Sequence, residues 1–137
     1  LIGLLVATVI LIPVGLGLGF VKLPHFPRDG DLFKIIARFT VILFGVAFPE
    51  EILFRSLIQN WLIRRFGPSN KVLLLAALIF GASHLNNGPG ALPNWRYMIL
   101  AAIAGFIYGK VFQKTSSVFS SAGLHAAVNT IRHTFFA

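Results

Sequence analysis

The chain has 137 residues, of which 56% are hydrophobic and only 12% are charged, with 12 Lys and Arg against 4 Asp and Glu and no Cys. An average soluble domain carries about 25% charged residues, so this composition excludes a water-soluble globule, a disordered segment, a nucleic-acid-binding protein and a disulfide-rich secreted domain. The class that remains is an integral membrane protein, whose formal charge of +8 suits basic loops beside a lipid bilayer.

Long apolar stretches predict the membrane spans of the first half. Residues 1–21 contain no charge and would cover about 30 Å as a helix, which is the thickness of the hydrocarbon core. Residues 22–31 contain two prolines and four charges, which predicts an exposed loop. Residues 32–66 would form a helix of about 50 Å, so we expect two pieces with a break at Pro49, because proline removes a helical hydrogen bond.

The second half of the chain predicts three more helices. They cover residues 71–85, 97–112 and 118–137. Trp95 and Tyr97 stand before the middle helix, where aromatic side chains commonly anchor a span at the membrane interface.

A stripe of small residues, Ala101, Gly105 and Gly109, recurs at four-residue intervals. Such a stripe predicts close packing against a neighbouring helix. The expected fold is therefore all-α, a polytopic transmembrane helical bundle with an active-site cavity inside the membrane. We expect one membrane domain over residues 1–137, as the C-terminal part of a longer chain.

Charged residues inside the apolar stretches are the first pointer to function, since a charge at the bilayer centre costs about 3 kcal/mol. Glu51 and Arg55 are four residues apart, the spacing of a helical ion pair with the acid first. Glu50 points about 100° away from Glu51 around the helix. The carboxylate of Glu50 is therefore left available for chemistry, unless it simply faces water at the membrane interface.

Two histidines also lie in apolar surroundings. His84 follows twelve uncharged residues, and His125 and Asn129 are four residues apart on one helical face. Glu50, His84 and His125 lie 14, 13 and 11 residues from the basic residues Arg64, Lys71 and Lys114. These separations place all three groups about 17 to 21 Å from one basic, cytoplasmic side. Each histidine alone is equally compatible with a structural role in helix packing.

Three short motifs carry a family resemblance: E-E-x-x-x-R from Glu50 to Arg55, F-x-x-x-H from Phe80 to His84 and H-x-x-x-N from His125 to Asn129. In this order, over residues 50–129, the chain resembles the CPBP family of intramembrane endopeptidases, which includes CAAX prenyl endopeptidases and bacterial Abi-type proteins. Ser56 departs from the glycine that usually follows the arginine, a change we expect to affect helix packing rather than chemistry.

The resemblance implies an endopeptidase that cleaves near the C-terminus or membrane anchor of a lipidated or membrane-anchored protein, within a prokaryotic cell membrane that the enzyme crosses several times. It implies that Glu50 is the general base and that His84 helps to hold and polarise the water. His125 and Asn129 would stabilise the oxyanion, as peptide hydrolysis requires. The supporting residues would be Glu51, Arg55 and Phe80.

Other functions remain open at this stage. Glu50, His84 and His125 could instead bind a catalytic zinc ion, but we favour a mechanism without metal because the chain has no H-E-x-x-H motif and Asn129 suits an oxyanion better than zinc. A proton-coupled carrier is an alternative, because Glu and His chains also relay protons across membranes. An immunity-type membrane protein without catalysis is another.

Overall fold

The computed structural model of the chain describes residues 1–25, 32–88 and 91–136. These residues form helices and connecting turns, and no strand occurs among them. In chain order the helical segments are α1 (Ile2–Gly17), α2 (Leu32–Ile42), η1 (Leu43–Ala47), α3 (Phe48–Glu51), η2 (Ile52–Gln59), α4 (Asn60–Phe66), α5 (Asn70–Ala82), α6 (Trp95–Thr115) and α7 (Val118–Phe135). The all-α class is confirmed, and most of the predicted loop at 22–31 lies outside the described residues.

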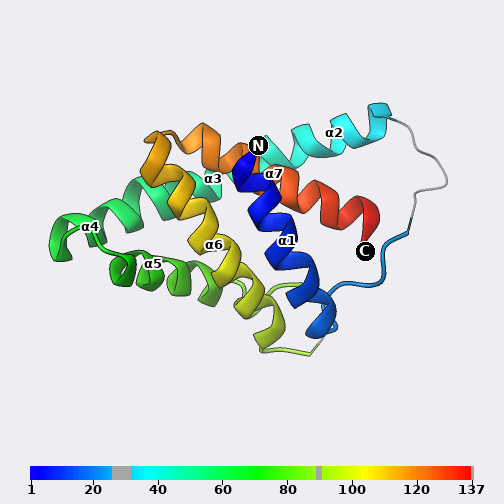
Figure 1. Cartoon of the computed structure of the whole chain (residues 1–137), viewed down its shortest axis with the longest axis horizontal. Helices are drawn as coiled ribbons and strands as arrows, with labels where there is room; N and C mark the ends of the chain where they lie inside the picture. The colour runs from blue at the N-terminus through cyan, green and yellow to red at the C-terminus, as the bar shows by residue number, and fades with distance from the viewer. Residues whose placement is uncertain (26–31, 89–90, 137) are drawn as a thin grey trace.

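The expected break at Pro49 is wrong, because residues 32–66 form one helical rod of 35 residues. Figure 1 shows α2, α3 and α4 following one another along one side of the molecule. Pro49 lies in the short α-helical turn between the π-helical segments η1 and η2. A π-helical turn shifts hydrogen bonding to the fifth residue back and widens the helix, so a proline can follow it without ending the rod.

Helix α1 is shorter than the apolar stretch that predicted it. It ends at Gly17, and Gly19 takes a positive φ of 62°. The amide of Gly19 donates to the carbonyl of Leu16 and that of Phe20 donates to the carbonyl of Gly15, which is a Schellman motif that closes the helix. The chain thus turns at Gly19 and brings Phe20 back against the bundle, where it contacts the ring of Tyr97.

Helix α6 packs against α5, α1 and α7 and crosses the bundle between α5 and α1 in Figure 1. The predicted small-residue stripe faces α5. A Cβ atom added at Gly105 would lie 2.7 Å from the ring of Phe80, and one at Gly109 would lie 2.5 Å from the side chain of Leu73. The stripe is therefore a packing surface, as expected, and it makes room for Phe80 beside the polar residues described below.

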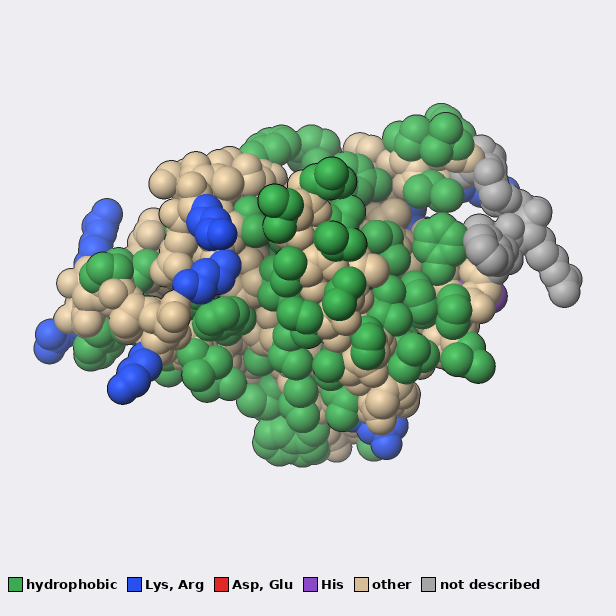
Figure 2. All heavy atoms as spheres, viewed as in Figure 1, with side chains coloured by type: hydrophobic (Ala, Val, Ile, Leu, Met, Phe, Trp, Pro, Cys, Tyr) green, Lys and Arg blue, Asp and Glu red, His purple; other side chains and the backbone are tan. Residues whose placement is uncertain are grey.

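The outer surface of the bundle is strongly apolar. Hydrophobic side chains cover most of the face in Figure 2, while Lys and Arg gather mainly at the end where α4, α5 and α6 meet. The rod of residues 32–66 and helix α6 are long and apolar enough to cross a membrane, and α1 and α5 are shorter apolar helices. Exposed apolar area on this scale suits lipid rather than water, so the fold is an all-α membrane helical bundle.

Candidate active site

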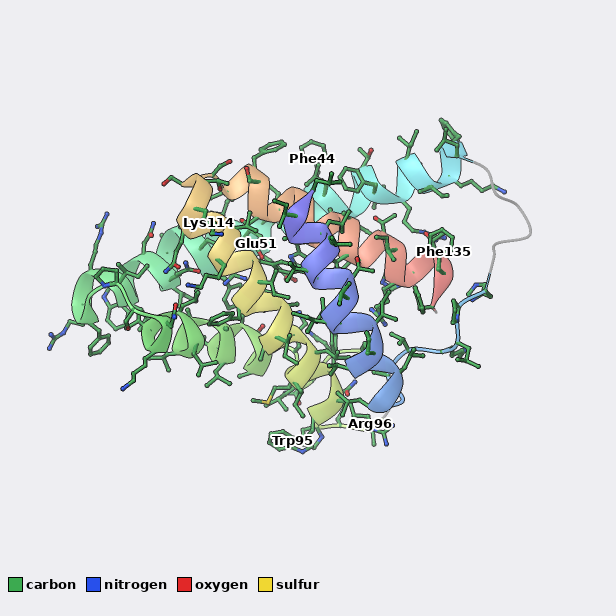
Figure 3. The ribbon with its side chains drawn as sticks, in the orientation of Figure 1. Phe44, Glu51, Trp95, Arg96, Lys114 and Phe135 are labelled. Carbon is green, nitrogen blue, oxygen red and sulfur yellow. The ribbon has the colours of Figure 1, made fainter. Side chains whose placement is uncertain are left out.

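Glu51 stands at the centre of a buried polar network. The Nε atom of Arg55 donates to Oε2 of Glu51 at 2.7 Å, and the Nη2 atom donates to Oε1 at 3.3 Å. The Nδ1 atom of His125 lies 3.2 Å from the same Oε1. All three side chains are buried, and Figure 3 shows Glu51 inside the bundle. The predicted ion pair is confirmed, but its contact with His125 across 74 residues of sequence was not predicted.

Gln59 extends this network by one helical turn, and the sequence analysis missed it. The Nη1 atom of Arg55 lies 3.5 Å from Oε1 of Gln59, and Nε2 of Gln59 donates to the backbone carbonyl of Gly109 at 3.2 Å. The sequence did contain a signal, because Glu51, Arg55 and Gln59 recur every four residues on one face. The buried network therefore joins the rod to both α6 and α7.

Glu50 and His84 face each other at the edge of this network. Oε2 of Glu50 lies 4.0 Å from Nε2 of His84. The side chain of Glu50 is 32% exposed, yet Oε2 itself is buried and has no hydrogen-bond partner among the described residues. A gap of 4.0 Å is too long for a direct hydrogen bond, but one water can bridge it.

The hydrogen bond made by the other ring nitrogen of His84, Nδ1, determines the tautomer of the neutral ring. Nδ1 lies 2.9 Å from the backbone carbonyl oxygen of Phe80 and 3.1 Å from Oγ of Ser83. A carbonyl oxygen only accepts, so Nδ1 carries the hydrogen and donates it. In the neutral ring, Nε2 therefore presents a lone pair towards Glu50.

Phe80 packs between the polar groups. Its ring centroid lies 4.8 Å from that of His84 and 5.9 Å from that of His125. The guanidinium carbon of Arg55 lies 5.1 Å from the same centroid, close enough for a cation–π interaction. Phe80 therefore contacts both His84 and the residues of the buried network.

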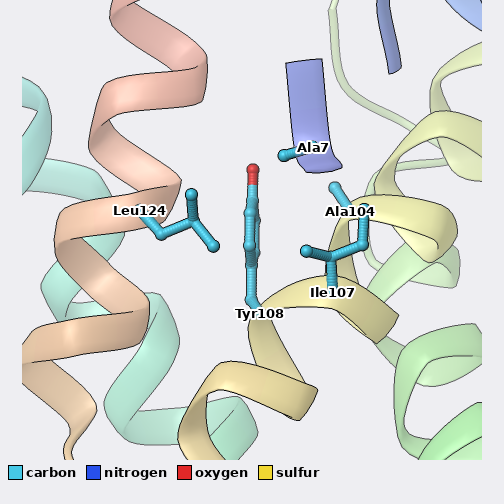
Figure 4. Close-up of a cluster of buried hydrophobic side chains, with 5 residues drawn as sticks. All are labelled: Ala7, Ala104, Ile107, Tyr108 and Leu124. Atoms are coloured by element: carbon cyan, nitrogen blue, oxygen red, sulfur yellow. The ribbon is translucent and has the colours of Figure 1, made fainter. Parts of the chain in front are cut away.

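Tyr108 is a second aromatic neighbour of His125. The two rings stack with centroids 4.8 Å apart and planes inclined by 19°. Figure 4 shows the Tyr108 ring between Leu124 on one side and Ile107 on the other, with its hydroxyl directed towards Ala7. An aromatic residue in an apolar helix gives no functional signal by itself, and the sequence did not single out Tyr108.

A cavity of about 80 Å³ adjoins these groups. Since roughly 15 Å³ suffices for one water, this space holds several. Apolar side chains dominate its wall, and the polar residues on it are Thr8, His84, Tyr97, Tyr108, His125, Asn129 and Arg132. Glu50 is not on this wall, and it faces the cavity-lining His84 at 4.0 Å.

The structure also gives Tyr97 contacts that the sequence did not predict. This residue was predicted as an interface anchor together with Trp95. Trp95 is 58% exposed, whereas the Tyr97 ring packs edge-on against His84 at 4.7 Å between centroids and lines the cavity. At the start of a helix, an anchor and a cavity-lining tyrosine have the same sequence signature.

The zinc alternative requires Glu50, His84 and His125 to converge on one point about 2 Å from each donor atom. Among residues 1–25, 32–88 and 91–136, no group of three or more His, Cys, Asp or Glu side chains is arranged to hold a metal ion. Nδ1 of His125 is turned to Glu51, and Nδ1 of His84 is turned to the carbonyl of Phe80. These donors do not fit a zinc site.

A comparison with protein families identifies the family to which the chain belongs. A family model described as Rce1-like, type II CAAX prenyl endopeptidase, matches residues 32–131. Comparison with curated proteins and with solved structures found no match. The matched range is most of the chain and contains all three motifs from Glu50 to Asn129. The chain therefore belongs to the Rce1-like family of type II CAAX prenyl endopeptidases, a family of membrane-embedded proteases.

Proposed function

We propose that this endopeptidase hydrolyses a peptide bond near the C-terminus or membrane anchor of a lipidated or membrane-anchored protein, using a water activated by Glu50 and His84. Family membership supplies the reaction class. The single observation behind the residue assignment is the buried, unpartnered Oε2 atom of Glu50, 4.0 Å from Nε2 of His84. A buried acceptor without a partner is unfavourable, and a bridging water removes that cost.

The hydrogen-bond directions favour a reactive orientation of this water. The carboxylate of Glu50 and Nε2 of neutral His84 both accept hydrogen bonds. A water between them therefore donates both of its hydrogens, and its lone pairs point away from the pair. When a carbonyl carbon approaches from that side, the water attacks while Glu50 accepts its proton, which is general base catalysis.

We propose His125 and Asn129 as the donors that stabilise the oxyanion. Both line the cavity beside His84. Nδ1 of His125 carries a hydrogen, because its partner Glu51 is a carboxylate that only accepts. Nε2 can therefore donate to the oxyanion only when the ring carries both hydrogens, while the amide of Asn129 donates in any case.

Glu51, Arg55 and Phe80 support the reacting groups in this proposal. Glu51 orients the imidazole of His125, Arg55 balances the charge of Glu51, and the Phe80 ring packs against both histidines. None of the three needs to contact the substrate. Their substitution should disturb the fold at least as much as the reaction.

We also propose that catalysis needs no metal ion. The donor arrangement described above supports this, since Glu50, His84 and His125 do not converge on one point. The test is the metal content of the purified, active protein together with its response to a chelator. Activity should persist after chelation. Stoichiometric zinc, with activity lost on chelation and restored by zinc, would contradict the proposal.

We propose that the protein crosses a prokaryotic cell membrane several times, with the basic end of the bundle cytoplasmic. The distribution of Lys and Arg supports this orientation through the positive-inside rule. Since the chain has no Cys, single Cys variants at Arg65 and Arg96 can be labelled in intact cells with a membrane-impermeant maleimide. Only the Cys at position 96 should react, and the opposite pattern would reverse the orientation.

The decisive test of the function uses the Glu50→Gln variant reconstituted in liposomes. The wild type should cleave a fluorogenic peptide carrying a lipid near its C-terminus, and the variant should bind that peptide without cleaving it. Ion flux through the wild type in the absence of any cleavage would favour a carrier. Full turnover by the variant would remove Glu50 from the mechanism.

A further inference from the structure

A second apolar hollow lies on the outer surface of the bundle, apart from the candidate active site. It is an open groove of about 670 Å³ that is lined by α5 and α6, together with Ile10 of α1. Leu74, Leu78 and Ile99 on its wall are exposed large hydrophobic residues. The groove therefore faces the surroundings of the bundle rather than its interior.

Helix α6 lines the groove with an apolar stripe that ends in a lysine. Ile99, Ile103 and Phe106 lie on the wall, and Lys110 follows Phe106 by four residues, so the four residues share one helical face. Nζ of Lys110 lies 5.8 Å from the ring centroid of Phe106, within the range of a cation–π interaction. The ammonium group of Lys110 is thus held at the end of the stripe.

Helix α5 repeats this pattern in the opposite direction. Lys71, Leu74 and Leu78 line the groove, and their spacing of three and four residues places them on one helical face. Nζ of Lys110 donates to Oδ1 of Asn70, the residue before Lys71, at 2.6 Å. The lysine ends of the two stripes therefore meet, and the apolar groove has two ammonium groups at one end.

The charge at this end of the groove is not compensated. Lys71 and Lys110 form no ion pair with the residues that the structure describes, whose acids, Glu50 and Glu51, are engaged at the candidate active site. An ammonium group has three hydrogens to donate, and Asn70 accepts one from Lys110. Figure 2 shows Lys and Arg gathered at the end where α4, α5 and α6 meet. This end of the groove thus suits an anion.

We propose that the groove binds one anionic phospholipid, whose phosphate accepts hydrogen bonds from Lys71 and Lys110 and whose acyl chain lies along the apolar stripes. Basic pockets between transmembrane helices commonly bind anionic headgroups. An acyl chain gains little by exchanging lipid neighbours for leucine, because both are equally apolar. The two lysines therefore select the lipid by its headgroup, and the groove sets the path of the chain.

The length of the groove matches one leaflet of a bilayer. Ile99 and Lys110 are eleven residues apart, which corresponds to about 16 Å of helix. A hydrocarbon core of about 30 Å gives about 15 Å for each leaflet. A phosphate held at Lys110 therefore leaves its acyl chain a path along α6 to the middle of the membrane.

Two other occupants fit the charges less well. A second copy of this chain would bring apolar helices, but its described acids are engaged in its own site and offer no counter-charge. The lipid group of a substrate is apolar and likewise leaves the two lysines without an anion. The phospholipid satisfies both the apolar wall and the positive end.

Photo-crosslinking in liposomes tests the inference without any need for cleavage, so its outcome is independent of the proposed function. Phosphatidylcholine liposomes contain a small fraction of phosphatidylglycerol or phosphatidylcholine with the same diazirine-labelled acyl chain, and mass spectrometry maps the labelled residues. Labelling on the groove wall, for example at Leu78 and Ile103, should be about 25-fold stronger with phosphatidylglycerol. Each of the two lysines contributes about fivefold, because one basic residue near the surface is worth about 1 kcal/mol. Equal labelling by the two lipids overturns the inference.

Charge variants test the headgroup site. Lys71→Gln and Lys110→Gln should each lower the preference for phosphatidylglycerol about fivefold, and glutamine at position 110 keeps an N–H donor for Asn70. Lys114→Gln is the matched control, because Lys114 is exposed one helical turn beyond Lys110 and does not line the groove. It should keep the wild-type preference. An equal loss in all three variants overturns the inference, since the lipid would then respond only to the overall basic surface.

Groove-filling variants test the path of the acyl chain. Leu74 and Leu75 are adjacent and similarly exposed, at 50% and 42%, but Leu75 does not line the groove. Leu74→Trp should lower phosphatidylglycerol labelling of the groove several-fold, and Leu75→Trp should leave it unchanged. Labelling that survives Leu74→Trp overturns the inference. So does displacement of phosphatidylglycerol by an uncharged, amidated lipopeptide, which would assign the groove to the lipid group of a substrate.

Discussion

Two neighbouring acids occupy opposite environments in this bundle. Glu51 is fully buried, and its carboxylate contacts both Arg55 and His125. Glu50 is one residue away and partly exposed, and its Oε2 atom, 4.0 Å from His84, has no hydrogen-bond partner among the residues that the structure describes. Because successive residues point about 100° apart on a helix, one short sequence directs one carboxylate into the network and the other to its edge.

The difference separates what the fold needs from what the reaction needs. A buried polar group that lacks a partner costs about 1 to 3 kcal/mol, so a fold gains nothing from the orphaned oxygen of Glu50. The network around Glu51 stabilises the packing of three helices. The gap between Glu50 and His84 adds nothing to that packing, but a water molecule can occupy it. Each of the following predictions tests one side of this contrast.

The largest expected effect is on activity, from Glu50→Gln. The amide cannot accept the proton of the attacking water, so the rate should fall by about 100- to 10,000-fold, the usual contribution of a general base. The free energy of unfolding should stay within about 0.5 kcal/mol of the wild type, because no described side chain donates a hydrogen bond to Glu50. Peptide cleavage assays and unfolding titrations with SDS measure the two effects.

Glu51→Gln should lower stability as well as activity, and it is the matched comparison for Glu50→Gln. Removing this charge leaves Arg55 buried without its ion-pair partner, which costs about 3 to 5 kcal/mol. Unfolding titrations with SDS, compared with Glu50→Gln under the same conditions, measure the loss. A Glu51→Gln protein with wild-type stability and no activity would mean that the roles of the two acids are exchanged.

Residue types predicted the helices better than they predicted how the helices face one another. The apolar stretches gave the class of fold, and four-residue spacing gave the Glu51–Arg55 pair and the packing stripe around Gly105. The break at Pro49 was wrong because residue types do not reveal the π-helical turns that accommodate a proline.

The contacts between helices could not be predicted from the sequence either. Spacing tells which residues share a face, but the rotation of α7 against the rod decides that His125 meets Glu51. Similarly, the turn at Gly19 brings Phe20 to Tyr97 and Arg132, and no local pattern in the chain encodes that meeting. The assigned roles of Glu50, His84, His125 and Asn129 stay predictions until the experiments above are done.

A smaller effect is expected from Gly105→Ala, which tests the packing that positions Phe80. The new Cβ atom would lie 2.7 Å from the Phe80 ring, so the ring or the helix must shift at a cost of about 1 to 3 kcal/mol. Gly123→Ala on α7 is the control, since a Cβ there meets nothing within 4 Å. Equal stability of the two variants would show that the α5–α6 contact is looser than the structure indicates.

Gln59→Met should give the smallest effect, and it asks whether the inner network only stabilises the fold or also positions His125. Methionine fills a similar volume but cannot donate to the carbonyl of Gly109 or accept from Arg55, so the free energy of unfolding should fall by about 0.5 to 1.5 kcal/mol. If the network also orients His125 through Arg55 and Glu51, kcat should fall several-fold while KM for the fluorogenic lipopeptide stays constant. A Gln59→Glu variant keeps an acceptor for Arg55, loses the donor to Gly109 and adds a negative charge beside Arg55, and should recover part of kcat. A loss of stability with unchanged kcat in both variants would confine Gln59 to the fold and restrict the positioning of His125 to Glu51 and Tyr108.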